Sequence, residues 1–304
     1  MSVGARKLVG RGLTGLTGVA ASLVVAMLLV ILWDVVAQGA GRVTWKFLTT
    51  SPEEGMTTGG IFPAIYGTVL MTLLMTVAVL PVGVLTAVYL HEYAPPRSRL
   101  AEAVRVAVTN LAGVPSIVFG LFGLGFFIQF VGRGLDRMFS EPGVLHYGQP
   151  ALVWASLTLA VLTLPVVIVS TEEALRAVPR DLRDASLALG ATKSQTLIRV
   201  VLPGALPGIL TGAILAVARG AGEVAPILFT GVAYFLPDLP RSLFSQFMHL
   251  GYHVYVLATQ SPDVEATRPL LYATVLVLLL LTFALNVVAI AIRTRTRRKA
   301  EGAH

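Results

Sequence analysis

Arg219 and Glu223 are two charged residues within a stretch, 211–231, that is otherwise apolar and rich in small side chains. A charge at the centre of a bilayer costs roughly 2.5–3.5 kcal/mol on insertion scales. The arginine fork can donate two parallel hydrogen bonds to an oxyanion, and a glutamate can accept one from a protonated oxyanion. The pair therefore predicts a polar lining on an anion path. The alternative is an ion pair that only neutralises itself.

A second candidate for the path lies at Pro115 and Ser116, within the apolar stretch 104–131. Proline removes a backbone hydrogen bond and breaks a helix. Broken membrane helices can aim the N-termini of their halves at anionic substrates. Alternatively, residues 100–113 form a separate interfacial helix, and the membrane span begins at Pro115. Both interpretations stay open from the sequence.

Several other kinds of chemistry are missing from the sequence. There is no cysteine, so disulfides and thiolate metal sites are excluded. There is no Gly-Lys dipeptide, so there is no P-loop, and no catalytic cluster or nucleophile elbow is present. His249 and His253 have the spacing of metal ligands on a helix, but a pair of surface histidines beside aromatic residues is the simpler interpretation. We predict no catalytic residue and no metal ligand.

The composition places these residues in a membrane. The chain has 304 residues, of which 55% are hydrophobic and 13% are charged, whereas a soluble domain is about a quarter charged. This predicts an all-α integral membrane protein. Six apolar stretches reach the ~20 residues that a bilayer requires: 16–38, 63–90, 104–131, 151–171, 205–230 and 269–292.

The basic residues predict the orientation. Most of the 23 lysines and arginines lie at the N-terminus, in 91–105, in 172–204 and in the tail 293–304. The positive-inside rule then puts both termini in the cytoplasm. A basic tail next to a membrane span is an anchor for lipid headgroups rather than a nucleic-acid arm, so we expect membrane lipid as a partner and no nucleic acid.

The spans divide the chain into three parts. Residues 1–62 hold the N-terminal tail, the first span and an extracytoplasmic loop. Residues 63–292 form the core, with five spans, the cytoplasmic loop 172–204 and the extracytoplasmic loop 231–268. Residues 293–304 are the basic tail.

The loop 172–204 predicts a helix–glycine–helix hairpin. Pro179 suits a first helical turn, and Gly190 suits the position after a helix end. Thr192 and Gln195 have the spacing of a capping box at the start of a second helix. The first helix carries an apolar stripe of Leu175, Val178, Leu182, Ala185 and Leu189. An exposed apolar stripe indicates a partner.

The same loop resembles the EAA loop of ABC importer permeases. That pattern is Glu-Ala-Ala, three residues, Gly, nine residues, Ile-x-Leu-Pro. The matching residues here are Asp184, Ala185, Ser186, Gly190, Val200, Leu202 and Pro203, at the same spacing. The resemblance implies a type I importer permease (MetI-like) fold. It also implies that Asp184, Ala185, Gly190, Leu202 and Pro203 couple the chain to a separate ATPase.

Four further stretches are similar to the phosphate-specific permeases of this family, the PstA group: "GVPSIVFGLFG" (113–123), "LPVVIVSTEEALRAVP" (164–179), "VARGAGEVAPILFTG" (217–231) and "ATQSPD" (258–263). The similarity implies a phosphate importer in the bacterial cytoplasmic membrane. The implied partners are a second homologous permease chain, two ATP-binding subunits and an extracytoplasmic phosphate-binding protein. ATP and Mg²⁺ would bind the partner ATPase, with no cofactor on this chain.

Rival functions remain open at this point. One is a permease for another oxyanion, such as sulfate or molybdate. Another is a secondary transporter driven by an ion gradient, and a third is a membrane-embedded hydrolase. The hairpin at 172–204 argues against the secondary transporter, because a gradient-driven carrier has no ATPase to dock. The lack of a catalytic cluster argues against the hydrolase.

Overall fold

The computed structural model describes residues 3–53, 58–95, 97–141, 143–261 and 263–301, and these are mostly helical. The elements in chain order are α1 (Val3–Gly39), η1 (Ala40–Arg42), α2 (Trp45–Thr49), β1 (Pro52–Glu53), β2 (Thr58–Gly59), α3 (Phe62–Val88), η3 (Tyr89–Tyr93), α4 (Arg99–Ala112), α5 (Ser116–Phe122), η4 (Gly123–Gly132), α6 (Arg133–Phe139), α7 (Leu152–Ala177), α8 (Arg180–Ala188), α9 (Lys193–Thr196), η5 (Leu197–Val201), α10 (Leu202–Gly220), α11 (Leu250–Thr259) and α12 (Val264–Glu301). η1 is a 3₁₀-helix, whereas η3, η4 and η5 are π-helical. β1 and β2 form a short antiparallel ribbon.

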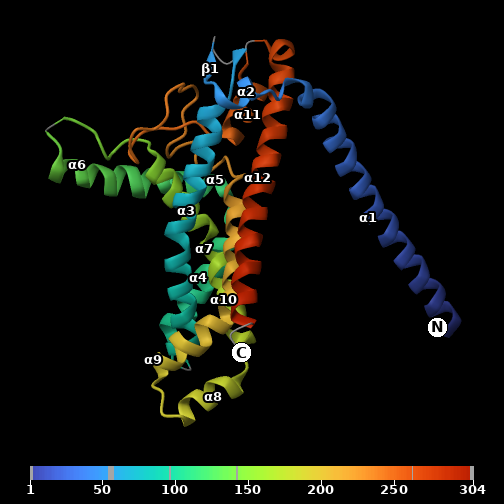
Figure 1. The fold of residues 1–304 in the computed structure, drawn as a ribbon, viewed down its shortest axis with the longest axis vertical. Helices are drawn as coiled ribbons and strands as arrows, with labels where there is room; N and C mark the ends of the chain where they lie inside the picture. Colours follow the sequence, from blue (N-terminus) through green and yellow to red (C-terminus); the bar gives the residue numbers. More distant parts are fainter. Residues whose placement is uncertain (1–2, 54–57, 96, 142, 262, 302–304) are drawn as a thin grey trace.

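A bundle of long helices forms the centre of the molecule. Figure 1 shows α3, α7, α10 and α12 running along one common direction, with α11 at one end of the bundle. α3 and α7 share the largest interface, and their fully buried side chains include Met71, Met75, Val79, Leu159 and Val167. Long apolar helices that bury only part of their surface against each other are typical of a membrane bundle.

The glycine face of α10 packs against α7. A Cβ added to Gly212 would lie 2.7 Å from the Cβ of Ser170, and one added to Gly208 would collide with Ala174. Small residues at four-residue spacing permit this close approach of two membrane helices.

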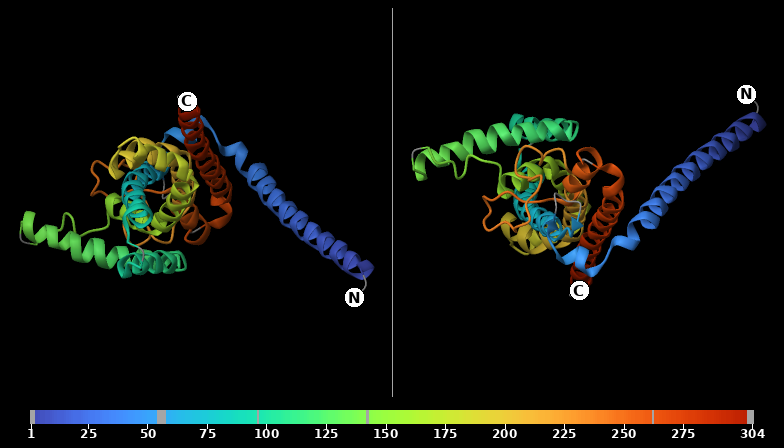
Figure 2. Two further views of the ribbon diagram at one scale, coloured as in Figure 1. Left: turned by 90° about the horizontal axis from the view of Figure 1, so that it is seen from below. Right: turned by 90° about the horizontal axis from the view of Figure 1, so that it is seen from above.

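The third apolar stretch, 104–131, is divided at Pro115, as the interpretation with a separate helix over 100–113 predicts. The chain forms two helices there, α4 and α5, and the candidate membrane span is Ser116–Phe139. Pro115 has an extended backbone with ψ 138°, so α4 cannot continue through it. In Figures 1 and 2, α5, η4 and α6 run outward across the direction of the bundle.

The fifth span also differs from the expected range 205–230. α10 ends at Gly220, and the chain continues as turns to Gly231, because a second glycine at 222 and Pro226 do not support a helix. At its other end, α10 continues directly from α9 and η5, so that the candidate span is Lys193–Gly220. Arg219 therefore stands in the last turn of a helix rather than at its middle.

The remaining candidate spans are Gly10–Arg42, Phe62–Tyr93, Leu152–Ala177 and Val264–Thr296, which brings the total in the described residues to 6. α1 leaves the bundle and contacts α12 near its own C-terminal end. A Cβ added to Gly39 there would lie 2.7 Å from the carbonyl oxygen of Tyr272. The basic tail predicted over 293–304 is helical to Glu301, and residues 302–304 lie outside the described residues.

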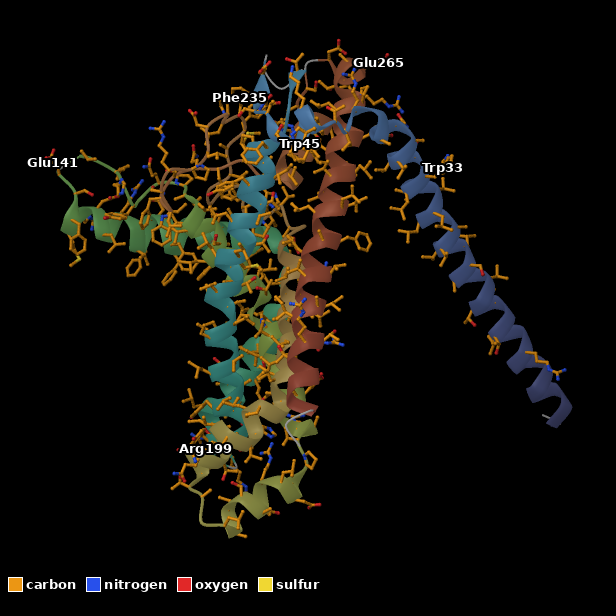
Figure 3. All side chains as sticks on the ribbon, in the orientation of Figure 1. Trp33, Trp45, Glu141, Arg199, Phe235 and Glu265 are labelled. Atoms are coloured by element: carbon orange, nitrogen blue, oxygen red, sulfur yellow. The ribbon has the colours of Figure 1, made fainter. Side chains whose placement is uncertain are left out.

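Part of the loop 231–268 is buried in the structure. α11 is buried between α3 and α12, where the backbone N–H of Leu250 donates to Oγ1 of Thr68 (2.9 Å). Figure 3 places Phe235 and Glu265 at one end of the bundle and Arg199 at the other. The loops 231–268 and 172–204 therefore lie at opposite ends, as the sequence predicts.

Candidate functional site

The Arg219–Glu223 ion pair forms at the C-terminal end of α10. Nε of Arg219 lies 3.6 Å from Oε1 of Glu223. Glu223 lies beyond the helix, in a turn that its backbone N–H closes by donating to the carbonyl of Gly220 (3.3 Å). The glycine-rich turn, rather than a continued helix, thus brings the two side chains together.

Both side chains of the pair are partly exposed in this chain. The side chain of Arg219 is 42% exposed and that of Glu223 is 24% exposed, whereas Ala216 and Gly220 are buried. No hydrogen bond joins either Nη of Arg219 to another described residue. Arg219 can therefore donate two parallel hydrogen bonds to an anion while Nε stays beside Glu223.

Pro115 and Ser116 stand at the start of α5. One turn further along α5, a Cβ at Gly120 would lie 3.0 Å from the carbonyl oxygen of Pro226. α5 therefore packs against the turn segment that follows Glu223. Among the described residues, no hydrogen bond or ion pair joins Pro115 or Ser116 to the charged pair. The structure thus brings α5 and the turn after Glu223 together without a described contact between these two residues and the charged pair.

The hairpin 172–204 has the predicted caps at Gly190, Thr192 and Gln195, whereas Pro179 stands just before α8 rather than in its first turn. Gly190 has a φ of +87°, which only glycine adopts without strain, and its N–H donates to the carbonyl of Leu187 (2.9 Å). Thr192 and Gln195 form the expected capping box: the N–H of Gln195 donates to Oγ1 of Thr192, and the N–H of Thr192 donates to Oε1 of Gln195 (2.9 Å). The helix–glycine–helix hairpin is therefore confirmed.

The apolar stripe of the hairpin is shorter than predicted. α7 ends at Ala177 and α8 starts only at Arg180, because Pro179 forces the residue before it into an extended backbone. The buried Leu175 and Val178 thus belong to the bundle. Leu182 is 51% exposed and Leu189 is 90% exposed, so the stripe on α8 lacks a partner within the described chain.

The residues of the EAA-like pattern fall into two groups. Asp184 and Ala185 are exposed on α8, and Gly190 forms the tip of the hairpin. Leu202 and Pro203 form the first turn of α10, directly after the π-helical segment η5. The pattern therefore spans both the hairpin and the helix that carries Arg219 at its far end.

Glu92, Arg183 and Lys193 were not singled out from the sequence, yet they fix the hairpin to the bundle. Oε1 of Glu92, in η3, lies 2.5 Å from Nη1 of Arg183 in α8. Nη2 of Arg183 also donates to the carbonyl of Leu175 (2.6 Å), and Nζ of Lys193 donates to the carbonyl of Glu92. A charged residue at the end of a span was the only signal for Glu92.

His249 and His253 are buried rather than at the surface, at 1% and 2% exposure. His249 is the N-cap of α11, and its Nδ1 accepts a hydrogen bond from the N–H of Gly251 (3.2 Å). Burial lowers the pKa of His249 to about 3 and that of His253 to about 4. Within the described residues, no group of three or more potential metal ligands occurs.

The comparison with family models matches residues 79–300 to the binding-protein-dependent transport system inner membrane component. The match includes α4 to α11, nearly all of α12, the whole hairpin 172–204 and the charged pair. Nothing in this match favours the gradient-driven carrier.

Three similar curated proteins have related names. The probable ABC transporter permease protein YqgI of Bacillus subtilis is 32% identical over 274 residues, which cover 86% of this chain and 88% of that protein. The phosphate transport system permease protein PstA 1 of Mycobacterium tuberculosis is 40% identical over 213 residues, with 68% of this chain and 64% of that protein covered. The PstA protein of Yersinia pestis is 35% identical over 216 residues, or 70% of this chain and 68% of that protein.

Two solved structures share the fold. A chain of a bacterial alginate ABC transporter has a TM-score of 0.67 at 15% identity, covering 95% of this chain and 96% of that chain. A chain of the inward-facing MetNI methionine ABC transporter has a TM-score of 0.54 at 21% identity, covering 75% of this chain and 94% of that chain. The predicted MetI-like fold is confirmed. With its six candidate spans, the chain is a multi-pass membrane permease subunit that belongs to the inner membrane component family of binding-protein-dependent transport systems.

Proposed function

We propose that this chain is the permease subunit of an ATP-driven importer of inorganic phosphate. The observation that carries the proposal is the partly exposed Arg219–Glu223 ion pair at the end of α10, with Nε and Oε1 3.6 Å apart. The relatives named as PstA proteins support phosphate as the substrate.

The chemistry of the pair favours phosphate among the oxyanions. Arginine donates to the anion oxygens in a fork geometry. Phosphate near neutral pH keeps a P–O–H group, and the carboxylate of Glu223 can accept a hydrogen bond from it. Sulfate has no such proton and would be repelled by the carboxylate. A transport path needs only weak binding, because it must release what it admits. Pro115 and Ser116 would line the same path from the start of α5.

The proposed partners are supported by the exposed hairpin 172–204 and by the family to which the chain belongs. The exposed stripe on α8 would dock in a separate ATP-binding subunit, with Asp184, Ala185, Gly190, Leu202 and Pro203 as the coupling residues. The complete importer would contain a second homologous permease chain, two ATP-binding subunits and an extracytoplasmic phosphate-binding protein. ATP and Mg²⁺ would bind the ATPase, and this chain would hold no cofactor. The membrane would be the bacterial inner membrane, with both termini in the cytoplasm.

Reconstitution tests this proposal directly. The chain is expressed with its copurifying subunits, placed in proteoliposomes with ATP on the coupling-loop side, and supplied with phosphate-loaded binding protein. We expect ATP-dependent phosphate accumulation that unlabelled phosphate competes away and sulfate does not. Equal uptake of sulfate or molybdate through the same complex would contradict phosphate as the substrate, and uptake without ATP would contradict the coupling to an ATPase.

A further inference from the structure

A separate basic cavity lies where α7 ends and the coupling hairpin begins. Its volume is about 590 Å³, and it is lined by His91, Arg176, Val178, Arg180, Arg183 and Asp184. These lining residues come from η3, from the end of α7 and from α8, and Figure 1 shows α8 at that end of the bundle. None of the expectations from the sequence assigns a role to this space.

The arginines of the cavity have unused donors. Arg180 makes no hydrogen bond or ion pair to another residue of the part described. The guanidinium of Arg176 has Glu172 as its nearest carboxylate, at 4.0 Å from Nη2. Arg183 uses both Nη atoms, but its buried Nε lacks a hydrogen-bond partner within the described residues. A buried donor without a partner costs free energy, and a ligand can satisfy it.

The acidic groups around the cavity do not balance these charges. Asp184 is the one carboxylate that lines it, against three guanidinium groups. Glu92 is occupied by Arg183, with His91 Nε2 also 3.8 Å away, and Glu172 is shared with Arg105 at 3.4 Å. The cavity therefore carries a net positive charge and fits an anion.

We propose that this cavity binds a phosphate group through Arg176, Arg180 and Nε of Arg183. The group belongs either to free inorganic phosphate or to the headgroup of an anionic lipid. Guanidinium groups recognise phosphate by parallel charge-assisted hydrogen bonds. A volume of about 590 Å³ lies within the usual size range of small-ligand sites.

This site is distinct from the proposed transport path. Val178, which lines the cavity, lies beside Gly204 in the first turn of α10. Arg219 is 15 residues further along that helix, which corresponds to about 20 Å at the rise of an α-helix. Binding in the cavity thus does not depend on which anion the path carries. A phosphate group there would bridge the end of α7 to α8 and hold the hairpin in one position.

Hydrogen exchange of the hairpin amides tests the proposal at the site itself. The full-length chain, with its copurifying subunits and without nucleotide, is placed in maltoside micelles that contain no phosphate. One arm adds inorganic phosphate, a second adds phosphatidylglycerol, and a control arm adds sodium chloride at equal ionic strength. We expect a ligand at ten times its dissociation constant to slow exchange across 180–188 about tenfold.

Slower exchange with phosphate alone assigns the site to free phosphate, and slower exchange with the lipid alone assigns it to the headgroup. Protection in both arms shows that the cavity accepts the group from either source. Protection in neither arm, or equal protection by sodium chloride, overturns the proposal.

Matched variants separate the cavity from general charge. Arg180→Gln and, independently, Arg176→Gln should remove the ligand-dependent protection while the unliganded exchange of α8 stays as in the wild type. Arg199→Gln makes the same change in charge at the same end of the bundle (Figure 3), and it should keep the protection. Asp184→Asn should lower the ligand concentration that is needed. Unchanged protection in both cavity variants would overturn the proposal.

Discussion

Glu92 and Arg183 are 91 positions apart in the chain, yet Oε1 of the first and Nη1 of the second are 2.5 Å apart. The side chains are 12% and 19% exposed. Glu92 stands in η3, which continues α3, and Arg183 stands in the middle of α8, so this pair joins the bundle to the hairpin 172–204. A displacement of α8 by a partner would be transmitted to α3 through it.

The first prediction is that Glu92→Gln weakens both stability and coupling. Removing one partner from a largely buried ion pair typically costs about 3–5 kcal/mol, and the remaining exposure of this pair places its cost toward the lower end. Thermal unfolding of the purified chain should shift to lower temperature, and less substrate should be transported per ATP hydrolysed.

Two variants show whether the link is specific. Exchanging the charges in the double variant Glu92→Arg, Arg183→Glu should recover part of the lost coupling. Glu102→Gln removes an exposed carboxylate from α4 and should change neither property. If Glu92→Gln leaves the ratio of transport to hydrolysis unchanged, the mechanical role is wrong.

The second prediction uses two glycines with the same backbone conformation. Gly190 and Gly143 have φ values of +87° and +86°, and a Cβ at either would meet nothing within 4 Å. Valine at either position should therefore cost about 1–2 kcal/mol through backbone strain alone. We expect both variants to insert in the membrane. Gly190→Val should abolish the stimulation of ATP hydrolysis by loaded binding protein, whereas Gly143→Val should retain this stimulation. Equal activity in the two variants would remove Gly190 from the coupling role.

The caps of the hairpin were predictable because each depends on residues a few positions apart. Gly190, Thr192 and Gln195 specify the turn and the second helix locally. The contact between Glu92 and Arg183 has no local signature, because it depends on how η3 and α8 pack in three dimensions. Sequence patterns specify elements more directly than they specify the contacts between elements.

The charged pair and the histidines also differ from their predicted surroundings. Arg219 and Glu223 were expected together on one continuous helix, and they do meet, but the helix ends at Gly220 and a turn brings them together. Three small or helix-breaking residues, Gly220, Gly222 and Pro226, were the available signal. His253 was expected at the surface, but α11 packs between α3 and α12, a tertiary contact that overrides its polarity.

The third prediction concerns orientation. α12 runs from Val264 to Glu301 and spans the bundle, so its two ends should face opposite sides of the membrane. The chain has no cysteine of its own, which makes single introduced cysteines clean reporters. An impermeant thiol reagent added to intact cells should label Val264→Cys and should not label Arg295→Cys until the cells are broken. The reverse pattern would put the termini outside.

The fourth prediction concerns acid stability. His249 and His253 have a pKa of about 3 and about 4 in the fold, against about 6.5 in an unfolded chain. Between these values the unfolded state binds more protons than the native state, so stability rises with pH and falls on acidification. Below pH 6.5 each imidazole should remove about 1.4 kcal/mol of stability per pH unit until its folded pKa is reached.

Unfolding of the purified chain at pH 7.5 and pH 5.5 measures this loss. His253→Phe should make the difference between the two pH values smaller, because both ring nitrogens of His253 lack a hydrogen-bond partner among the described residues. His146→Phe alters an exposed imidazole and should leave the difference unchanged. A pH dependence that His253→Phe does not reduce would contradict the assignment.

The last prediction concerns the ion pair in the proposed path. If Arg219 donates to the transported anion, Arg219→Gln removes a hydrogen bond to a charged group, worth about 1.5–3 kcal/mol. Uptake should then fall by roughly 10- to 100-fold, while copurification with the ATPase subunits stays intact. Glu223→Gln should reduce phosphate uptake less and should weaken the rejection of sulfate, because the repelling charge is gone. Arg137→Gln, which removes an exposed arginine from α6, is the control and should transport normally.

The double variant Arg219→Gln, Glu223→Gln separates the two interpretations of the pair. A pair that only neutralises itself loses nothing when both charges are removed, so the double variant would then transport as the wild type does. A pair that binds the anion through Arg219 leaves the double variant as inactive as Arg219→Gln alone.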